Sequence, residues 1–501
     1  MVNELIQAIV RKIFVILLVI PHFVFSQCLT MDSLNMFIAK QVRDYKIPGL
    51  AIGIIQNDSV IFKHGYGMTS TSAGLPVTTQ TVFPISSCTK AFTAAAIGIL
   101  VDEGKLSWND KVIKYLSDFK MSTPWITKEL TISDILSHRS GLATYVGDLL
   151  WYGTDYTRDQ IINKIQYLPI RNNFRVDFGY SNLMYLLAAK IIERVSGQTW
   201  EQFIKEKLLI PLSMLNTSIG TTQMEEMGNY ALPHLQDKPF QPVNMDNIAP
   251  AGGINSNIDD LMKWVKMWIG NGRIGNNVII NTNPVETITS IKTLTSASSD
   301  NGYGFGWFIK YQNGQKIIYH DGGMPGYKSN IIILPKSGDA IVILTNKISP
   351  LNDQLINVIL NYLANSKKIN WAEADKNMFF KDKVYRWDKK RNDGTKLKSF
   401  IPHIVDYTGV YEDAVYGKAI IKQEKIKATL TLLPAKKLFT GTLYYLAPKK
   451  LEVIFKDVFI SPGEIIFDKK NNRIYGFKMN IPTNDFHFEN LYFKKRTPIK
   501  P

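Results

Sequence analysis

The order of strand-like and helix-like segments constrains this chain more than any other feature of its sequence. Strand-like runs come first, helical periodicity occupies the middle, and strand-like runs return before a closing helix. The expected strands are Leu50–Ile55, Ser59–Tyr66, Phe305–Tyr311, Lys316–His320, Ser329–Leu334 and Ala340–Leu344. The expected helices include Asp32–Tyr45, Thr89–Glu103, Tyr185–Val195, Asp259–Trp268 and Asn352–Leu363. This order predicts an α/β domain over residues 30–365, in which both ends of the segment contribute strands to one mixed sheet.

The last quarter of the chain has a different pattern. Residues 366–400 are polar, charged and poorly periodic, which predicts a linker. Residues 401–498 contain short alternating runs separated by Gly, Pro and Asn, which is typical of an all-β sheet or small barrel. These runs are Lys418–Ile421, Thr429–Leu433, Thr440–Leu446, Glu452–Phe455, Glu464–Phe467 and Ile474–Met479. We therefore expect a separate C-terminal β domain.

The positive charge of the chain is concentrated in this last quarter. The net charge is +16, of which residues 365–501 contribute +13 and residues 1–364 only +3. Basic runs of this kind are most simply solvated surface, and no nucleic-acid-binding motif accompanies them. We expect no nucleic-acid partner. The alternative interpretation, which is more specific, is that the basic C-terminal domain contacts an anionic cell-envelope polymer.

Composition excludes several other classes of protein. Hydrophobic residues make up 45% and charged residues 20%, which argues against a disordered, collagen-like or polytopic membrane protein. Two cysteines exclude a disulfide-built scaffold, and the seven histidines never recur at a spacing of two or four residues. We expect neither a metal site nor a cofactor.

The first residues have the pattern of an export signal. Arg11 and Lys12 precede an apolar run from Ile13 to Phe25, which is too short to span a bilayer comfortably. The sequence predicts a signal peptide over residues 1–26 and a periplasmic or secreted protein. Cys28 follows the expected cleavage site, but Gln27 stands where a lipid-attachment motif favours a small residue. A retained N-terminal anchor and a lipid anchor at Cys28 are the alternatives.

Ser87 and Lys90 form the first candidate catalytic pair. They stand in the motif Ser87-Cys88-Thr89-Lys90 at the start of an apolar helix. A spacing of three residues puts both side chains on one face of a helix, within reach of each other. Burial of the lysine would lower its pKa, so that it could accept the serine proton. Alone the motif is weak, because an N-cap serine and a solvated lysine give the same pattern. We expect Cys88 to be a buried filler rather than a redox-sensitive thiol.

Two further motifs follow in a recognisable order. Tyr180-Ser181-Asn182 stands 93 residues after Ser87, and His320-Asp321-Gly322-Gly323 begins 140 residues after Tyr180. Together with segments 48–50, 134–142 and 251–256, this series resembles the serine β-lactamase-like hydrolases. That group includes class C β-lactamases, D-alanyl-D-alanine carboxypeptidases, D-aminopeptidases and related esterases. The resemblance covers about residues 32–365. It implies a mixed domain with an antiparallel sheet flanked by helices, plus a helical subdomain. Residues 407–411 resemble the start of the lipocalin-like domain often joined to these hydrolases.

The resemblance implies a role for each matching position. Ser87 would attack a carbonyl carbon and form an acyl-enzyme, with Lys90 and Tyr180 sharing the acid–base work. We expect the nearby Lys90 to keep the Tyr180 phenol partly ionised. Asn182 would bind the substrate amide. The backbone N–H groups of Ser87 and Gly323 would form the oxyanion hole, with Gly322 and His320 beside them in the substrate-binding strand.

His320 departs from the family pattern and leaves the substrate open. Many relatives have lysine at this position to hold a substrate carboxylate, whereas a histidine is mostly neutral at pH 7. The resemblance therefore implies a peptidase or esterase acting on D-Ala-type peptides or esters. A true β-lactamase and a non-catalytic penicillin-binding-like sensor or scaffold remain alternatives. The sequence does not determine the oligomeric state.

Overall fold

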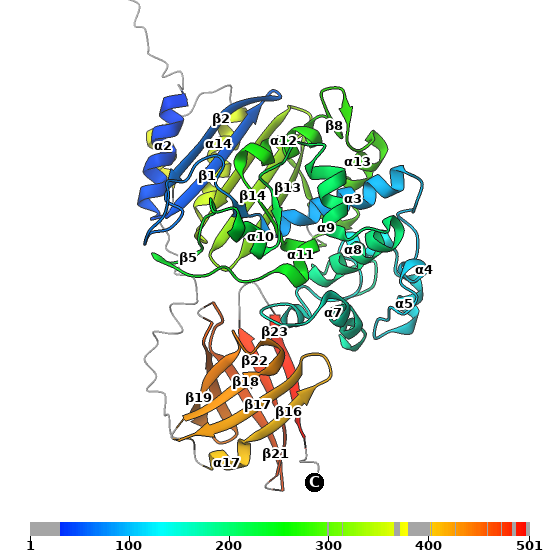
Figure 1. The fold of residues 1–501 in the computed structure, drawn as a ribbon, viewed down its shortest axis with the longest axis vertical. Coiled ribbons are helices and arrows are strands. Elements are labelled where there is room, and N and C mark those ends of the chain that lie inside the picture. Colours follow the sequence, from blue (N-terminus) through cyan, green and yellow to red (C-terminus); the bar gives the residue numbers. More distant parts are fainter. Residues whose placement is uncertain are drawn as a thin grey trace, which may run out of the picture.

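The computed structural model describes residues 31–297, 300–312, 314–364, 371–378, 401, 403–425, 427–457, 459–471, 473–482 and 487–496. The predicted signal peptide and Cys28 lie outside the described residues. Figure 1 shows an α/β domain and, below it in this view, a β-barrel formed by the C-terminal part of the chain. In the part of the chain that is described, no helix is long and apolar enough to cross a membrane.

An eight-stranded antiparallel sheet forms the centre of the α/β domain. In spatial order its strands are β10 (Thr293–Leu294), β11 (Gly302–Tyr303), β12 (Phe308–Gln312), β13 (Gln315–Met324), β14 (Tyr327–Leu334), β15 (Asp339–Thr345), β1 (Gly49–Gln56) and β2 (Ser59–Gly67). The pairing of β1 with β15 joins the two ends of the domain, with Ile52 opposite Ile343. The prediction of one sheet built from both ends is confirmed, but the expectation that this sheet is mixed is wrong. Its strands are antiparallel to each neighbour in the sheet.

Helices cover both faces of this sheet. On one face, α2 (Met31–Asp44) and α14 (Leu351–Ala364) pack against Leu50, Ile52 and Ile54, alternate residues of β1. The other face packs against α3 (Thr89–Asp102) and α12 (Ile258–Ile269). Because α3 is buried along nearly its whole length, it lies in the core of the domain rather than on its surface.

A helical subdomain fills the space beside α3. Its central helix, α8 (Asn182–Ser196), packs against α3 and ends at Gly197, whose φ of 74° suits glycine. The remaining helical segments are α4 (Val112–Tyr115), α5 (Pro124–Glu129), α6 (Ile132–Leu136), η2 (Asp148–Leu150), α7 (Arg158–Lys164), η3 (Ile165–Tyr167), α9 (Trp200–Ile204), η4 (Lys205–Leu209), α10 (Thr221–Glu226), η5 (Asp246–Ile248), α11 (Ala249–Gly252) and α13 (Thr282–Ile288).

Short strands connect the subdomain to the sheet. Periodicity alone favoured helix across the middle of the chain, but several turns there pair as two- or three-residue strands. They are β3 (Phe83–Pro84), β4 (Ser218–Ile219) and β7 (Ile254–Ser256) in one small sheet, and the pairs β5 (His234–Leu235) with β6 (Lys238–Pro239) and β8 (Arg273–Ile274) with β9 (Asn277–Val278). Strands this short leave no readable two-residue alternation.

The expected linker contains an ordered element. Residues 371–378 include α15 (Trp371–Asn377), and Asp375 of this helix pairs with Lys40 of α2 at 2.8 Å. Gln41 Nε2 also donates to Asp375, at 2.6 Å. This short helix is held by residues of α2, far away in the sequence, and local composition carries no signal of such contacts. The sequence therefore did not predict it. The rest of 366–400 lies outside the described residues.

The C-terminal strands close into an eight-stranded barrel. They are β16 (Gly409–Asp413), β17 (Gly417–Glu424), β18 (Lys427–Leu432), β19 (Thr440–Ala447), β20 (Lys450–Phe455), β21 (Gly463–Lys470), β22 (Arg473–Pro482) and β23 (His487–Lys495), preceded by α17 (Ile404–Tyr407). The all-β prediction is confirmed, although β23 was not expected. Its buried residues Phe488, Leu491 and Phe493 do not keep a strict period of two, because the pairing of β22 with β23 shifts register.

The mouth of the barrel docks on the helical subdomain just after η2. Tyr152 is fully buried, packs its ring against Phe439 and Phe488, and donates a hydrogen bond to Asp457 Oδ2 at 2.8 Å. The next residue, Gly153, has a φ of +65° and lies against Leu438. A β-carbon at this glycine would approach Leu438 Cδ1 to 2.4 Å, so glycine permits the close approach of the two domains.

Candidate active site

Ser87 lies on a tight turn between the small sheet and the core helix. The turn is η1 (Ser86–Cys88), and α3 begins directly after it at Thr89. Ser86 has a φ of 47°, a left-handed conformation that is unusual for a residue with a side chain. Ser86 and Cys88 are buried, whereas Ser87 is partly exposed. The turn therefore presents the Ser87 hydroxyl to solvent from an otherwise buried segment.

Lys90 lies one turn later on α3, beneath the serine. Its side chain is fully buried, and Nζ is 3.1 Å from Ser87 Oγ. Nζ also donates to Asn182 Oδ1 and to the Ala251 carbonyl oxygen, both at 2.8 Å. A neutral amine has two N–H bonds and one lone pair. With both hydrogens directed at carbonyl oxygens, the lone pair faces the Ser87 hydroxyl.

Burial makes the neutral form of Lys90 accessible. Loss of solvent lowers the pKa of Lys90 from 10.5 to about 7, while the nearby carboxyl of Asp148 opposes this shift. About half of the molecules then carry an uncharged amine at neutral pH. The amine is thus both placed and poised to accept the Ser87 proton.

Tyr180 lies beside Ser87 but stays protonated. Its hydroxyl hydrogen-bonds with Ser87, and Lys90 Nζ lies 4.8 Å from the centre of its ring. Burial nevertheless raises the pKa of Tyr180 well above its ordinary value, and the interactions that oppose this shift are smaller. The expectation of a partly ionised phenol is therefore wrong. Tyr180 is suited to donating a proton or a hydrogen bond rather than to acting as the base.

Asn182 connects Lys90 to a carboxyl group that the sequence analysis missed. It is the first residue of α8, but its side chain points to the site instead of capping the helix. Its Nδ2 donates to Asp148, at 3.1 Å from Oδ2 and 3.3 Å from Oδ1. Trp151 Nε1 donates to the same carboxyl group at 2.8 Å. Burial raises the pKa of Asp148 from 3.8 to about 7.

Strand β13 forms the opposite wall of the site. A β-carbon at Gly322 would lie 2.2 Å from the Ile85 carbonyl oxygen, so only glycine lets this strand approach the serine turn so closely. Gly323 has open space around its Cα, facing the cavity. Gly323 therefore lies in the cavity wall that also contains Ser87.

His320 is held as a neutral ring. Its Nδ1 lies 2.7 Å from the Asp321 carbonyl oxygen, which can only accept, so Nδ1 carries the hydrogen. Nε2 is 3.1 Å from the Tyr303 hydroxyl. Burial and the neighbouring Lys90 lower the pKa of His320 from 6.5 to about 3. His320 therefore brings no positive charge for a substrate carboxylate.

Cys88 lies behind this strand, away from the cavity. It is fully buried, its Sγ lies 3.2 Å from the His320 carbonyl oxygen, and burial raises the pKa of its thiol to about 12. A thiol with so little thiolate is a poor nucleophile and metal ligand. Within the described residues, no group of three or more His, Cys, Asp and Glu side chains is arranged to hold a metal ion.

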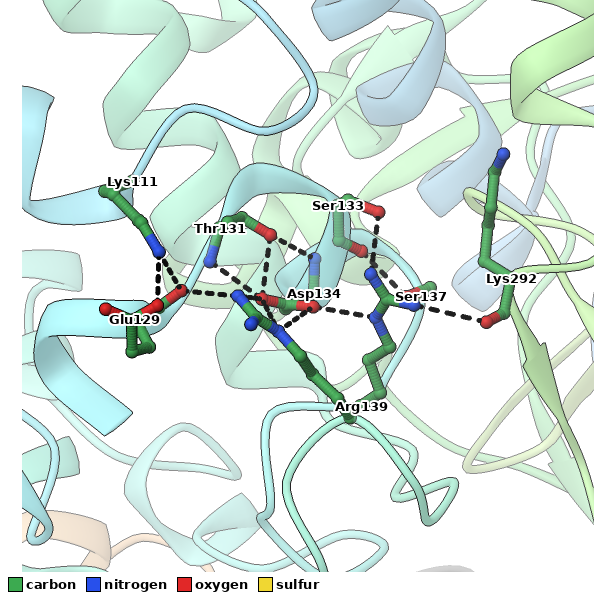
Figure 2. A network of polar contacts seen from close by, with 9 residues as sticks. Lys111, Glu129, Thr131, Ser133, Asp134, Ser137, Arg139 and Lys292 are labelled. Carbon is green, nitrogen blue, oxygen red and sulfur yellow. Dashed lines mark hydrogen bonds and ion pairs between the residues drawn. The ribbon is translucent and has the colours of Figure 1, made fainter. Parts of the chain in front are cut away.

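An ionic network around one buried carboxylate supports the segment that leads into Tyr180 (Figure 2). Asp134, fully buried in α6, caps that helix through Thr131 and lies between two arginines. Arg139 Nε donates to Asp134 Oδ1 at 2.7 Å, and Arg175 pairs with Oδ2 at 2.9 Å. Since Arg139 and Arg175 lie on separate loops, the carboxylate joins the residue 137–142 loop to the segment that leads into Tyr180.

The loop held by this network contacts the tyrosine motif directly. His138 lies in this loop with a φ of 58°, and its Nδ1 accepts a hydrogen bond from the Ser181 N–H at 3.1 Å. Its carbonyl oxygen accepts from the Gly179 N–H at 2.8 Å. The imidazole ring also packs on Tyr180, with ring centres 4.3 Å apart. The network thereby fixes the backbone on both sides of Tyr180.

The predicted site residues lie around one open cavity of about 470 Å³. Ser87, Tyr180, Asn182, His320, Gly322 and Gly323 line it, and Lys90 lies just beneath. Much of the remaining wall is apolar or aromatic, and includes Trp151, Phe178, Met245, Ile248, Phe308, Met324 and Tyr327. Phe459, from the barrel, also lines the cavity, so both domains contribute to the wall. The loop that carries it is held by Asp457, the partner of Tyr152.

Comparison with known proteins agrees with this geometry. A family model described as Beta-lactamase matches residues 34–364, about two thirds of the chain. The chain belongs to the beta-lactamase family. Members of this family are generally serine hydrolases, and the shared region contains the Ser87, Tyr180 and His320 motifs.

Relatives within the beta-lactamase family differ in their names. The unguisins hydrolase ungD' of Aspergillus campestris is 30% identical over 380 residues, covering 70% of this chain and 66% of that protein. The chain thus matches slightly less than two thirds of that relative's length. Protein flp of Staphylococcus aureus is 26% identical over 369 residues, covering 70% of each chain.

Solved structures share the fold at lower identity. The octameric penicillin-binding protein homologue from Pyrococcus abyssi has a TM-score of 0.59 and 23% identity, covering 93% of this chain and all of that one. The crystal structure of SurE gives 0.55 and 17%, covering 93% of this chain and 98% of that one. Because 93% of the chain is covered, the likeness extends beyond the α/β domain.

Sequence reasoning missed three features of the beta-lactamase-like site: Asp148, His138 and Phe459. Asp148 and Phe459 stand outside the quoted motifs, and only tertiary packing brings them to the site. His138 could have been noted, because it falls within the family-like segment at residues 134–142.

Proposed function

We propose that this protein is an exported serine hydrolase that forms an acyl-enzyme on Ser87 and acts on D-Ala-type peptides or esters. The observation that carries the proposal is the contact between Ser87 Oγ and a fully buried Lys90 amine at 3.1 Å. An amine with a pKa of about 7 can take a serine proton at neutral pH.

The acylation step follows from these contacts. Neutral Lys90 takes the Ser87 proton while Oγ forms a bond to the substrate carbonyl carbon. The backbone N–H groups of Ser87 and Gly323 stabilise the resulting oxyanion. Collapse of this intermediate breaks the bond to the leaving group, which receives a proton from Tyr180 or from the Lys90 ammonium. Water then hydrolyses the acyl-enzyme and releases the acid.

The lining of the cavity favours a substrate that has no carboxylate in need of a positively charged partner. His320 is neutral, and Lys328, the one lysine or arginine among the described lining residues, already pairs with Asp353 at 2.6 Å. The apolar and aromatic wall suits a hydrophobic substituent. Esters, and D-Ala-type peptides whose C-terminal carboxylate is blocked, fit these features better than β-lactams, which carry a free carboxylate close to the scissile bond. A relative named as a hydrolase adds support for turnover.

Location and surface contacts complete the proposal. The N-terminal pattern of basic residues followed by an apolar run supports export to the periplasm or the exterior. The positive charge of the C-terminal domain supports contact with an anionic envelope polymer.

The test uses two covalent probes on the wild-type protein, Ser87→Ala and Lys90→Ala. Each protein is treated with a fluorophosphonate and, separately, with a fluorescent penicillin, then read by intact mass. We expect rapid fluorophosphonate labelling of wild type only, and little or slow labelling by penicillin. Rapid turnover of a chromogenic cephalosporin would instead identify a β-lactamase. Stable labelling without turnover of any ester or D-Ala peptide would identify a sensor, and no labelling of the folded wild type would reject the catalytic function.

A further inference from the structure

A buried carboxyl group lies behind the catalytic lysine, and no step described above uses it. Asp148 is only 1% exposed and does not line the cavity, so it is placed to act on other residues rather than on a substrate. It begins η2 and contacts the Asn182 amide and the Trp151 indole. Asn182 in turn contacts Lys90. The amide therefore joins the carboxyl group to the amine.

The carboxylate determines which end of the Asn182 amide faces Lys90. In its ionised form the Asp148 carboxylate can only accept hydrogen bonds, and it does accept them from Trp151 Nε1 and Asn182 Nδ2, so the amide NH₂ points toward Asp148 and the carbonyl oxygen toward Nζ. The reverse orientation would place an oxygen against the carboxylate and an NH₂ group against the amine. With Oδ1 fixed, the amine directs one hydrogen to it and one to the Ala251 carbonyl oxygen. Its lone pair is then left for Ser87.

We propose that Asp148 is a positioning residue of the active site: it orients the Asn182 amide, and so the Lys90 amine, and it places a negative charge behind that base. The inference rests on the proposed function, because it assigns a role in the same acylation step. Asp148 acts through Asn182 and Lys90 and does not itself touch the reacting atoms.

Among the titratable groups that interact with Lys90 in the described structure, Asp148 is the one that can carry a charge near neutral pH. The other titratable groups that interact with Lys90 in the described structure are Cys88, His138, Tyr180, Tyr185 and His320. Burial keeps each of them uncharged near neutral pH, since it raises the pKa of the thiol and phenols and lowers the pKa of the imidazoles. Burial also raises the pKa of Asp148, to about 7, so its negative charge opposes the effect of burial on Lys90 in those molecules in which the carboxyl group is ionised, and these become the majority above that pH.

The experiment compares the pH dependence of fluorophosphonate labelling in wild type, Asp148→Asn and Asp148→Leu. Asparagine keeps an oxygen for Trp151 and Asn182 but removes the charge, so Lys90 becomes neutral at lower pH. We expect the midpoint of the rate profile to fall by up to about one pH unit, with the plateau rate largely kept. Leucine also removes the acceptor that orients Asn182, and we expect its plateau rate to fall by at least about tenfold.

A matched control uses a second buried carboxyl group that contacts the same segment. Asp457 accepts a hydrogen bond from Tyr152, four residues after Asp148, and is not among the groups that shift the pKa of Lys90. Asp457→Asn should leave the midpoint unchanged. A purely structural role for Asp148 would lower stability without moving the midpoint. An unmoved midpoint, or one that rises, in folded Asp148→Asn overturns the inference even when wild type is labelled normally.

A thermodynamic measurement covers the case in which wild type is not labelled and the proposed function fails. The stability difference between Asp148→Asn and the double variant Asp148→Asn/Lys90→Met is measured against pH. This stability difference should begin to rise at a lower pH than the corresponding difference between the wild-type protein and Lys90→Met. An identical onset would overturn the link between Asp148 and Lys90 without any need for activity.

Discussion

Replacing Lys90 with methionine tests whether burial holds this amine neutral. Lys90 is fully buried, and its pKa falls from 10.5 to about 7. In the unfolded chain the lysine keeps its proton up to its ordinary pKa. Between about pH 7 and pH 10.5 the unfolded state therefore binds more protons than the folded state. The wild-type protein gains stability as the pH rises through this interval, and Lys90→Met lacks that gain.

The magnitude follows from the two pKa values. The whole interval from 10.5 to about 7 corresponds to roughly 5 kcal/mol. Because Lys90 is already half neutral at pH 7, the gain from pH 7 to pH 9 is about 2 kcal/mol, and from pH 6 to pH 7 it is below about 0.5 kcal/mol. Asp148 acts in the same direction. In Lys90→Met no ammonium lies beside Asp148, so the pKa of Asp148 rises further. Ionisation of this carboxyl group as the pH rises then lowers the stability of the variant.

Urea unfolding at pH 6, 7, 8 and 9 measures this difference. Seven of the nine tryptophans lie in the α/β domain and none lies in the barrel strands, so tryptophan fluorescence mainly follows the α/β domain. The curves of unfolding free energy against pH should diverge by about 2 kcal/mol between pH 7 and pH 9. Lys207→Met, at a surface ion pair with Glu103, provides the control and should run parallel to wild type. Parallel curves for wild type and Lys90→Met would refute a neutral Lys90 and, with it, the proposed base.

Three further predictions concern catalysis, the ionic network and the domain contact. The rate of fluorophosphonate labelling of wild type should rise with pH and be half-maximal near pH 7, where the amine loses its proton; a rate that stays flat from pH 5 to pH 9 would contradict this. Asp134→Ala leaves Arg139 and Arg175 without their buried partner and should destabilise the protein by about 3 kcal/mol in urea unfolding. The control Asp353→Ala removes an exposed ion pair and should cost less than about 1 kcal/mol. Equal costs for the two variants would argue against the network. Gly153→Ala should lower the free energy of unfolding by about 1–3 kcal/mol more than Gly197→Ala, because both glycines have positive φ but only a β-carbon at Gly153 would clash with the barrel. Hydrogen exchange at the barrel mouth should become faster in the same variant. Equal losses for the two variants would show that Leu438 moves aside without cost.

The sequence by itself determined the features that depend on local order. Short apolar runs at both ends of the α/β segment were enough to predict one sheet, because short apolar runs bounded by turn residues are typical of buried strands, and β1 and β15 are buried almost throughout. The contact between Ser87 and Lys90 is also local, since residues three apart in a helical turn share a face. The closely packed glycine at Gly322 belongs to a motif that was readable in the sequence.

The tertiary structure decided the ionisation states and the long-range partners. Tyr180 was expected to be partly ionised, but burial, which no local pattern reports, keeps its phenol protonated. Asp148 reaches Lys90 only because η2, α3 and α8 pack together, and Phe459 reaches the cavity only because the barrel docks at Tyr152. Spacing along the chain therefore identifies groups that can react. The free energy of each proton depends on solvent exclusion and on charges brought close by folding, which are properties of the packed molecule.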